Sequence, residues 1–145
     1  YLKHGCREVG GQNKGPWCRL IAGDAGEARG DAWCGHYMVH LSKQAEHPLA
    51  GRLSASCDVI GRNARRDGRL SPVPEVGILF LVRGPSAANP WVHTGLVTGV
   101  HLDASGKAEA VTTNEGNSDS DGGREGHEVC ERVRGVGRLD FVGLG

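Results

Sequence analysis

The stretch WVHTGLVTGVHLDASGKAEAVTTNEG, residues 91–116, decides the fold class of this chain. Two runs rich in β-branched residues, 91–103 and 108–116, flank the short turn ASGK. Runs of this kind around a short turn predict two antiparallel strands joined as a β-hairpin.

Further strands are predicted on both sides of this hairpin. Upstream, the apolar run VGILFLVRG at 76–84 is closed by a Gly-Pro pair. Downstream, a polar loop at 117–126 leads to a last strand pair, HEVCERVRG at 127–135 and LDFVGL at 139–144. The second half of the chain is therefore expected to form a meander of strands.

The first half of the chain has helical periodicity instead. Pro16 is suited to start a helix and Gly23 to stop it. Apolar residues recur at helical spacing from Cys34 to about Glu46, and a third helix is predicted over 49–67. Helices followed by strands predict an α+β fold, with N-terminal helices packed on an antiparallel β-sheet.

Length and charge narrow the function classes. A chain of 145 residues fits one domain with a real core. Its 17 basic and 17 acidic residues balance, which argues against nucleic acid or an anionic membrane as the main partner. No apolar run approaches the roughly 20 residues of a membrane span. The sequence begins at Tyr1 and shows no signal peptide, as an excised domain or a processed form would.

Five cysteines leave two redox interpretations open: one free thiol with two disulfides in an oxidising compartment, or five thiols. No pair has CxxC spacing, which argues against a zinc ribbon or a redox motif. The cysteines are Cys6, Cys18, Cys34, Cys57 and Cys130.

Cys34 stands out because it begins a predicted helix, in GDAWCGHYMVH at 30–40. A helix N-terminus favours the thiolate, which is the reactive form of cysteine. We expect Asp31 to cap this helix. The N–H groups at the same end are suited to hold the oxyanion of a tetrahedral intermediate.

A cysteine nucleophile also needs a base and a group that orients the base. His93 lies in an otherwise apolar strand, where a histidine is either structural or catalytic. Pairing through the turn at 104–107 would place Glu115 and Asn117 near the level of residues 94–96, within reach of that imidazole. His36 and His40 are too close to Cys34 along the helix to turn back toward it.

Four segments, in this order, resemble the CHAP family, the cysteine- and histidine-dependent amidohydrolases and peptidases of the NlpC-type papain-like superfamily. They are REVGGQNKGPWCRL, AWCGHYMVHLSKQA, WVHTGLVTGV and TTNEGNSDSDGGREGHEVCERVR. The resemblance covers most of the chain and implies one catalytic domain over residues 1–145 with a papain-like fold. Two positions depart from the family pattern: Gly35 replaces the usual alanine after the nucleophile, and Ile78 stands at a position that is usually aspartate.

The resemblance also implies a role for each catalytic residue. Cys34 would attack an amide carbonyl and form a thioester. His93 would take the thiol proton and later protonate the leaving amine. Glu115 would orient His93, and Asn117 would share that task or polarise the substrate.

Trp33 and Trp91 stand beside the proposed nucleophile and base. They are expected either to wall a substrate groove or to pack in the core.

The implied function is a peptidoglycan hydrolase that acts at the bacterial cell wall, whether secreted, periplasmic or delivered by a phage or secretion system. It would cut the sugar–peptide amide, or a bond of the stem or crossbridge peptide. Peptidoglycan is the implied partner, an immunity or inhibitor protein is a further one, and the chemistry needs no metal or other cofactor. Two alternatives stay open: a non-catalytic binding module on the same fold, and a toxin deamidase or transglutaminase that acts on protein glutamine.

Two acidic stretches are candidates for calcium. Residues 117–128 fit a calcium-loop pattern except at the first position, but their flanks are predicted strands rather than helices. Asp24, Glu27 and Asp31 precede Cys34, where some CHAP domains bind calcium. For residues 117–128, a solvated loop is the alternative.

Two further patterns have simple structural alternatives. His36 and His40 have a spacing that can hold zinc, but the sequence offers no third ligand and favours an exposed pair. The basic cluster RNARRDGR at 62–69 would either touch an anionic polymer or form a solvated helix end.

Overall fold

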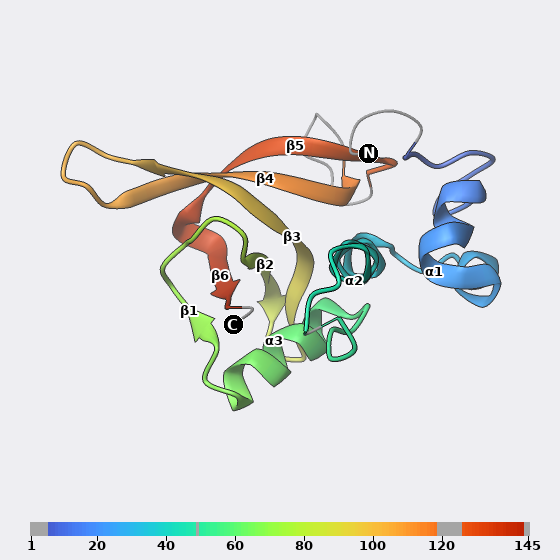
Figure 1. Cartoon of the computed structure of the whole chain (residues 1–145), viewed down its shortest axis with the longest axis horizontal. Coiled ribbons are helices and arrows are strands. Elements are labelled where there is room, and N and C mark those ends of the chain that lie inside the picture. Colours follow the sequence, from blue (N-terminus) through green and yellow to red (C-terminus); the bar gives the residue numbers. More distant parts are fainter. Residues whose placement is uncertain (1–5, 49, 119–125, 144–145) are drawn as a thin grey trace. The chain divides into compact units, whose positions relative to one another are not determined.

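The computed structural model describes residues 6–48, 50–118 and 126–143, and it has the predicted α+β class, with three helices and one six-stranded antiparallel sheet (Figure 1). The elements in chain order are α1 (Pro16–Arg29), α2 (Cys34–Gln44), α3 (Cys57–Arg66), β1 (Leu70–Ser71), β2 (Leu79–Ser86), β3 (Asn89–Leu102), β4 (Ala108–Ser118), β5 (Glu128–Gly135), the 3-10 turn η1 (Val136–Arg138) and β6 (Leu139–Val142). In the described part of the chain, no helix has the length and apolar character needed to cross a membrane.

The chain forms two compact units. The first comprises Tyr1–Ala55 and Glu115–Cys130, and the second comprises Ser56–Asn114 and Glu131–Gly145. Helices α1 and α2 belong to the first unit, and α3, β1, β2, β3 and β6 to the second. Strands β4 and β5 each contribute residues to both units.

Helix α1 begins where the sequence predicts, with Pro16 in its first turn. Gly23 does interrupt the helix, at φ 77° and ψ 168°, but helical structure resumes beyond it and continues to Arg29. Gly30, at φ 72°, provides the left-handed conformation that ends the helix, and its N–H donates to the carbonyl of Glu27. The sequence therefore located the break in α1 but not its end.

Helix α2 begins at Cys34 as predicted and ends at Gln44, two residues earlier than expected. The predicted capping role of Asp31 is wrong. Trp33 is the N-cap residue, and it makes no side-chain capping hydrogen bond. The Asp31 carboxylate instead pairs with the Arg29 guanidinium at 2.6 Å.

An aromatic cluster forms the interior of the first unit. Trp17 of α1 meets Trp33, Tyr37 and His40 edge-on, with ring centroids 5.8–6.3 Å apart. Trp33 and Tyr37 are also in edge contact, at 6.5 Å. Edge-to-face contacts at these separations are favourable beyond the area they bury, so the cluster fixes α1 against the N-terminal half of α2.

Helix α3 begins at Cys57 rather than near residue 49, which corrects the predicted start. The Ser56 hydroxyl accepts from the N–H of Val59 at 3.4 Å, an N-cap interaction that defines the helix start. Residues 50–56 form turns and irregular structure, so the apolar periodicity of 49–67 continued beyond the helix itself.

The sheet has the strand order β1-β6-β2-β3-β4-β5. The predicted hairpin is confirmed: β3 pairs with β4 from Leu96 opposite Asn114 to Leu102 opposite Ala108. The meander prediction holds for β2 to β5 only, because β6 returns to pair with the other edge of β2. The two-residue strand β1, which the sequence did not indicate, adds to the far side of β6.

The core of the second unit lies on this sheet. Its fully buried members come from four strands and are Phe80, Val97, Val111, Leu139 and Phe141. Helix α3 packs against β3, and Gly61 is the point of closest approach, since a Cβ there would lie 2.5 Å from Cζ3 of Trp91.

Candidate functional site

Cys34 is the first residue of α2 and is buried, with 5% of its surface exposed. The first turn of a helix has backbone N–H groups without intrahelical partners and carries a partial positive charge. Since the N-cap residue Trp33 makes no side-chain capping hydrogen bond, the N-terminus of α2 itself is the feature that would favour an anion at Cys34.

The backbone at Ala55 passes close to Gly35 and explains why glycine occupies this position. A Cβ at Gly35 would lie 2.5 Å from the carbonyl carbon of Ala55 and closer still to its oxygen. The absence of a side chain therefore lets the backbone at Ala55 approach the residue that follows Cys34. The departure from the CHAP pattern at this position has a steric reason.

The end of β4 packs on the same part of α2. A Cβ at Gly116 would lie 2.8 Å from the ring of Trp33 and from Cβ of Tyr37, so this position also requires glycine. Glu115 and Asn117, the residues on either side, are buried, with 0% and 3% of their surface exposed. The backbone of β4 at Gly116, between these two buried residues, therefore lies against the start of the helix that Cys34 begins.

Glu115 accepts a hydrogen bond from the hydroxyl of Ser118 at 3.2 Å. Ser118 is itself fully buried. A carboxylate in such a place is stabilised by the donors around it. Ser118 falls in the stretch predicted as a polar loop and was not among the predicted site residues, whereas β4 continues to that residue.

Asn117 has two unusual properties. Its backbone is left-handed, at φ 55°, a conformation that asparagine tolerates better than most residues. Its buried Oδ1 has no hydrogen-bond donor among the described residues. Because buried polar atoms are nearly always paired, an orphaned acceptor calls for a partner outside the described contacts, such as a ligand N–H.

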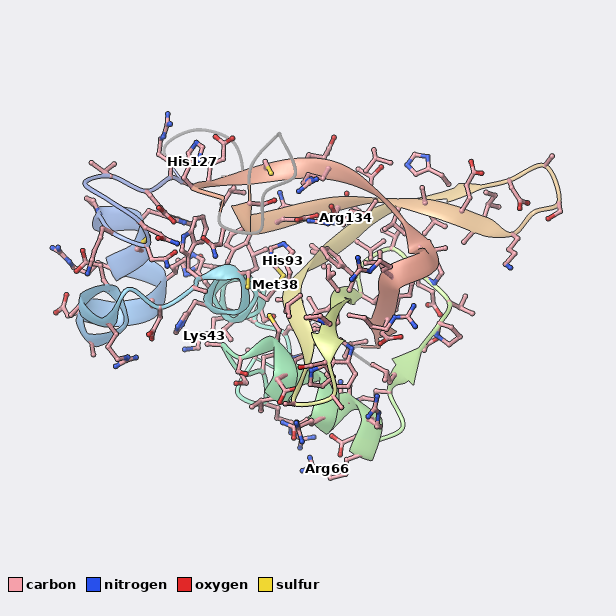
Figure 2. All side chains as sticks on the ribbon, turned by 180° about the vertical axis from the view of Figure 1, so that it is seen from behind. Met38, Lys43, Arg66, His93, His127 and Arg134 are labelled. Atoms are coloured by element: carbon pink, nitrogen blue, oxygen red, sulfur yellow. The ribbon has the colours of Figure 1, made fainter. Side chains whose placement is uncertain are left out.

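His93 lies on β3 in the second unit and is buried, with 5% of its surface exposed (Figure 2). Val82 is its partner on β2, whereas the next residue of β2, Arg83, pairs with Trp91. This shift makes Val92 a β-bulge directly before His93. Bulges re-aim side chains and are frequent beside active sites. The His93 ring lies 6.1 Å from the Phe80 ring, so packing holds one side of the imidazole.

Trp33 and Trp91 are interior residues of their own units. The indole N–H of Trp33 donates to Glu8 at 2.9 Å, and that of Trp91 donates to Asp140 at 2.9 Å. The Arg65 guanidinium covers the Trp91 ring at 4.8 Å. With 0% and 1% of their surfaces exposed, both rings favour the packing interpretation over the groove-wall interpretation.

His36 shares the first unit with Cys34. Its Nε2 lies 3.8 Å from Oδ2 of Asp31, so the carboxylate expected to cap the helix faces this imidazole instead. Burial lowers the pKa of His36, and the negative charges of Asp31 and Cys34 oppose that effect. His40 lies against Trp17, and burial lowers its pKa too. The two histidines are half-buried rather than an exposed pair.

None of the five cysteines forms a disulfide. Burial raises the pKa of Cys18 to about 11 and also raises that of Cys6, which disfavours their thiolates. Cys57 is a finding that the sequence did not indicate, because it too is the first residue of a helix, α3. The Ser56 side chain caps that helix, whereas the N-cap residue of the helix at Cys34 makes no side-chain capping hydrogen bond.

The acidic residues before Cys34 are engaged with basic groups or N–H donors. Asp24 lies 3.5 Å from Arg19, and Glu27 accepts from the N–H of Gly15 at 3.2 Å. Within the described residues, no three His, Cys, Asp or Glu side chains are grouped so that they would hold a metal ion. Most of the second calcium candidate, residues 119–125 of the loop, lies outside the described residues.

The basic cluster at 62–69 forms the end of α3, where Arg66 projects (Figure 2). Arg62 pairs with Asp58 at 2.6 Å, and Arg66 pairs with Asp67 at 2.9 Å. Arginines in the last turn also complement the helix dipole. These contacts favour the helix-end interpretation over a polymer-binding one.

Comparisons of the chain with protein-family models, with curated proteins and with solved structures found no match.

Proposed function

We propose that this chain is a cysteine amidase or peptidase of the papain-like CHAP type, which cleaves an amide bond of peptidoglycan at the bacterial cell wall. One observation carries the proposal. Cys34 begins a helix whose N-cap residue, Trp33, makes no side-chain capping hydrogen bond, and the buried Glu115–Ser118 segment packs on the same helix end.

In this mechanism the Cys34 thiolate attacks the amide carbonyl carbon, and a C–S bond forms as the carbonyl oxygen becomes an oxyanion. The N–H groups in the first turn of α2 are the donors for that oxyanion. His93 takes the thiol proton and then delivers it to the leaving amine, so that the C–N bond breaks and a thioester remains. Water activated by His93 hydrolyses the thioester and restores the thiol.

Glu115 and Asn117 support the charged imidazole in this proposal. A buried carboxylate stabilises an imidazolium, and an orphaned amide oxygen accepts a ring N–H or a substrate N–H. Thiol hydrolases need a nucleophile, a base and a group that orients the base, and the proposal assigns these roles to Cys34, His93 and Glu115. Trp33 and Trp91 then act through packing, not through contact with the substrate.

The first experiment incubates the protein with purified peptidoglycan and identifies the products by mass spectrometry. The native protein should release fragments whose masses name the bond that is cut, and Cys34→Ala should release none. Cys57→Ala is the matched control, because Cys57 is also a buried first residue of a helix. Loss of activity in Cys57→Ala with retention in Cys34→Ala would contradict the assignment of the nucleophile.

A second experiment tests the base. The mechanism requires the imidazole of His93 to take the proton of the Cys34 thiol. Activity should be lost in His93→Ala and kept in His36→Gln. The reverse result would make His36, with Asp31 beside it, the base instead.

If the protein releases no fragments from several types of peptidoglycan, labelling with a thiol-reactive probe distinguishes the two alternative functions. A thiol-reactive probe that labels Cys34 selectively in such a silent protein would favour another acyl substrate, such as protein glutamine. No selective labelling would favour a binding module on the same fold.

A further inference from the structure

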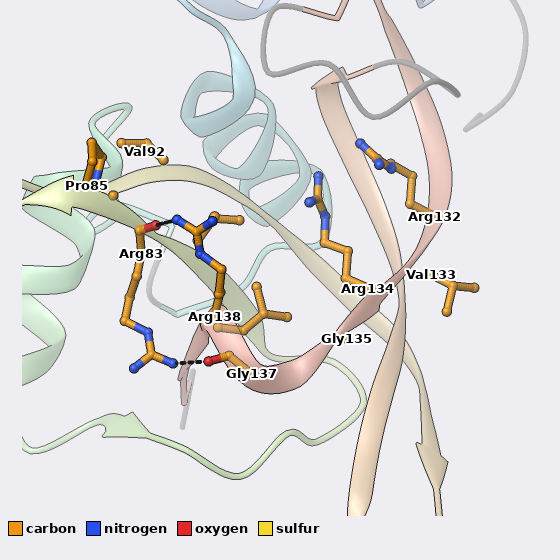
Figure 3. Close-up of a pocket in the computed structure, with 12 residues that line it drawn as sticks. Arg83, Pro85, Val92, Arg132, Val133, Arg134, Gly135, Gly137 and Arg138 are labelled. Carbon is orange, nitrogen blue, oxygen red and sulfur yellow. Dashed lines mark hydrogen bonds between the residues drawn. The ribbon is translucent and has the colours of Figure 1, made fainter.

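A pocket of about 460 Å³ lies within the second unit, and none of its lining residues is used in the proposed chemistry, although Val92 directly precedes His93 (Figure 3). Its walls come from β2, β3, β5 and η1, together with the first residue of β6. This volume falls within the roughly 300–1,000 Å³ of small-molecule sites. The pocket is therefore large enough to hold a small ligand.

The charge of the lining is one-sided. Of its 12 residues, four are arginines, and the lining contains no aspartate or glutamate among the described residues. The arginines are Arg83, Arg132, Arg134 and Arg138. Guanidinium groups around one small volume repel one another, and a bound anion relieves that repulsion.

Two of these arginines are presented by β5. Arg132 and Arg134 alternate along the strand and extend to the same side of it, whereas Val133 points to the other side (Figure 3). The Arg134 guanidinium lies 5.6 Å from the centre of the Phe80 ring, and this cation–π contact limits its motion.

The other two arginines each donate to a backbone carbonyl of the pocket lining. Arg83 donates from Nη2 to the carbonyl of Gly137 at 2.7 Å, and Arg138 donates from Nη2 to the carbonyl of Arg83 at 3.4 Å (Figure 3). A guanidinium has five N–H donors. Each of these bonds uses one N–H to hold the side chain in place. Arg83 also lies 4.0 Å from Asp140, behind the lining.

We propose that this arginine pocket binds a small anion with at least two negative charges, of the phosphate-monoester or dicarboxylate kind. Planar guanidinium forks match the oxygens of both groups and bind them through paired N–H···O bonds. The apolar groups of Pro85, Val92 and Leu139 complete the lining and suit a short carbon skeleton. The proposal does not depend on the cysteine chemistry, because it concerns binding alone.

The test is calorimetric titration of the full chain with pyrophosphate and, separately, with succinate, at about 0.15 M salt. We expect one saturable site with a dissociation constant of about 1 mM or below for at least one of the two anions. Tighter binding of pyrophosphate would identify a phosphate ligand, and tighter binding of succinate a carboxylate ligand.

The variant Arg132→Gln/Arg138→Gln should weaken that binding at least about tenfold, because each change removes charged hydrogen-bond donors from the pocket. Arg52→Gln/Arg62→Gln is the matched control, since it makes the same charge change outside the lining and should bind as the native protein does. Thermal melting establishes that both variants are folded.

Three outcomes would overturn the proposal. The first is no binding of either anion up to about 10 mM. The second is an equal loss in the control variant, which would show a general charge effect. The third is tight binding of a short single-stranded oligonucleotide through these arginines without binding of the small anions.

Discussion

Replacing Gly35 with alanine gives this chain the residue that the CHAP pattern usually has after the nucleophile, and we expect it to destabilise the protein. The new methyl group would lie 2.5 Å from the carbonyl carbon of Ala55 and closer to its oxygen. The end of a long side chain can relieve such a clash by changing its rotamer, whereas backbone atoms cannot.

The magnitude follows from two opposing effects. Overpacking costs about 1–3 kcal/mol, and a backbone clash belongs at the upper end of that range. Alanine in place of glycine within a helix recovers about 1 kcal/mol. The net loss in the free energy of unfolding is therefore about 2 kcal/mol, which corresponds to a fall in Tm of about 4–8 °C for a chain of this size.

The assay is urea denaturation together with thermal melting of Gly35→Ala, with Gly51→Ala as the control. No heavy atom lies within 4 Å of a Cβ built at Gly51, so that variant should stay within about 0.5 kcal/mol of the native protein. An unchanged or raised Tm for Gly35→Ala would refute the steric explanation, because it would mean that the backbone at Ala55 moves aside without cost.

Three further predictions concern groups with unusual environments. Burial lowers the pKa of His36, so the unfolded chain binds more protons than the folded one below about pH 6.5, and stability should fall as the pH drops through this range. His36→Gln should flatten that slope in urea melts at several pH values, and an unchanged slope would contradict this assignment. Cys18, with its pKa raised to about 11, should be alkylated at pH 7 only after unfolding, and rapid labelling of the folded protein at this residue by mass spectrometry would contradict its burial. Trp91→Phe leaves the Asp140 carboxylate without its indole donor and should cost about 2–3 kcal/mol in the free energy of unfolding, and a loss below about 0.5 kcal/mol would show that the hydrogen bond contributes little.

The parts of the fold that local sequence determines were predicted well. The hairpin of β3 and β4 follows from two β-branched runs around a short turn, and its pairing of Leu96 with Asn114 is close to the expected register. Helix α1 starts at Pro16 and α2 at Cys34, and both starts follow from residues within one helical turn. Such features need no knowledge of distant segments.

The parts that depend on competition between partners were not predicted. Asp31 has two nearby choices, the helix N-terminus and Arg29, and the charged hydrogen bond to the guanidinium is the stronger. The return of β6 to β2 is a long-range pairing, and the two-residue strand β1 exists only because β6 offers it an edge.

The candidate site shows the same division. Cys34 was found from its place before a helical pattern, and Glu115 from its place in the hairpin. Cys57 was not recognised as a helix-start cysteine, since apolar spacing alone placed that helix start several residues too early. The left-handed backbone and orphaned oxygen of Asn117 are properties of the folded chain, and sequence periodicity does not predict them.

The division of β4 and β5 between two compact units bears on how the protein is made. Each unit is assembled from two separate segments, so the chain passes from one unit to the other after Ala55, Asn114 and Cys130. During synthesis, the first unit lacks the strand end that packs on Trp33 until residues beyond Glu115 have emerged from the ribosome. Contacts this distant in sequence slow folding, because loop closure must precede them. Neither unit is a contiguous stretch that a single truncation would release, and the nascent chain should acquire protease resistance late and in one step rather than unit by unit.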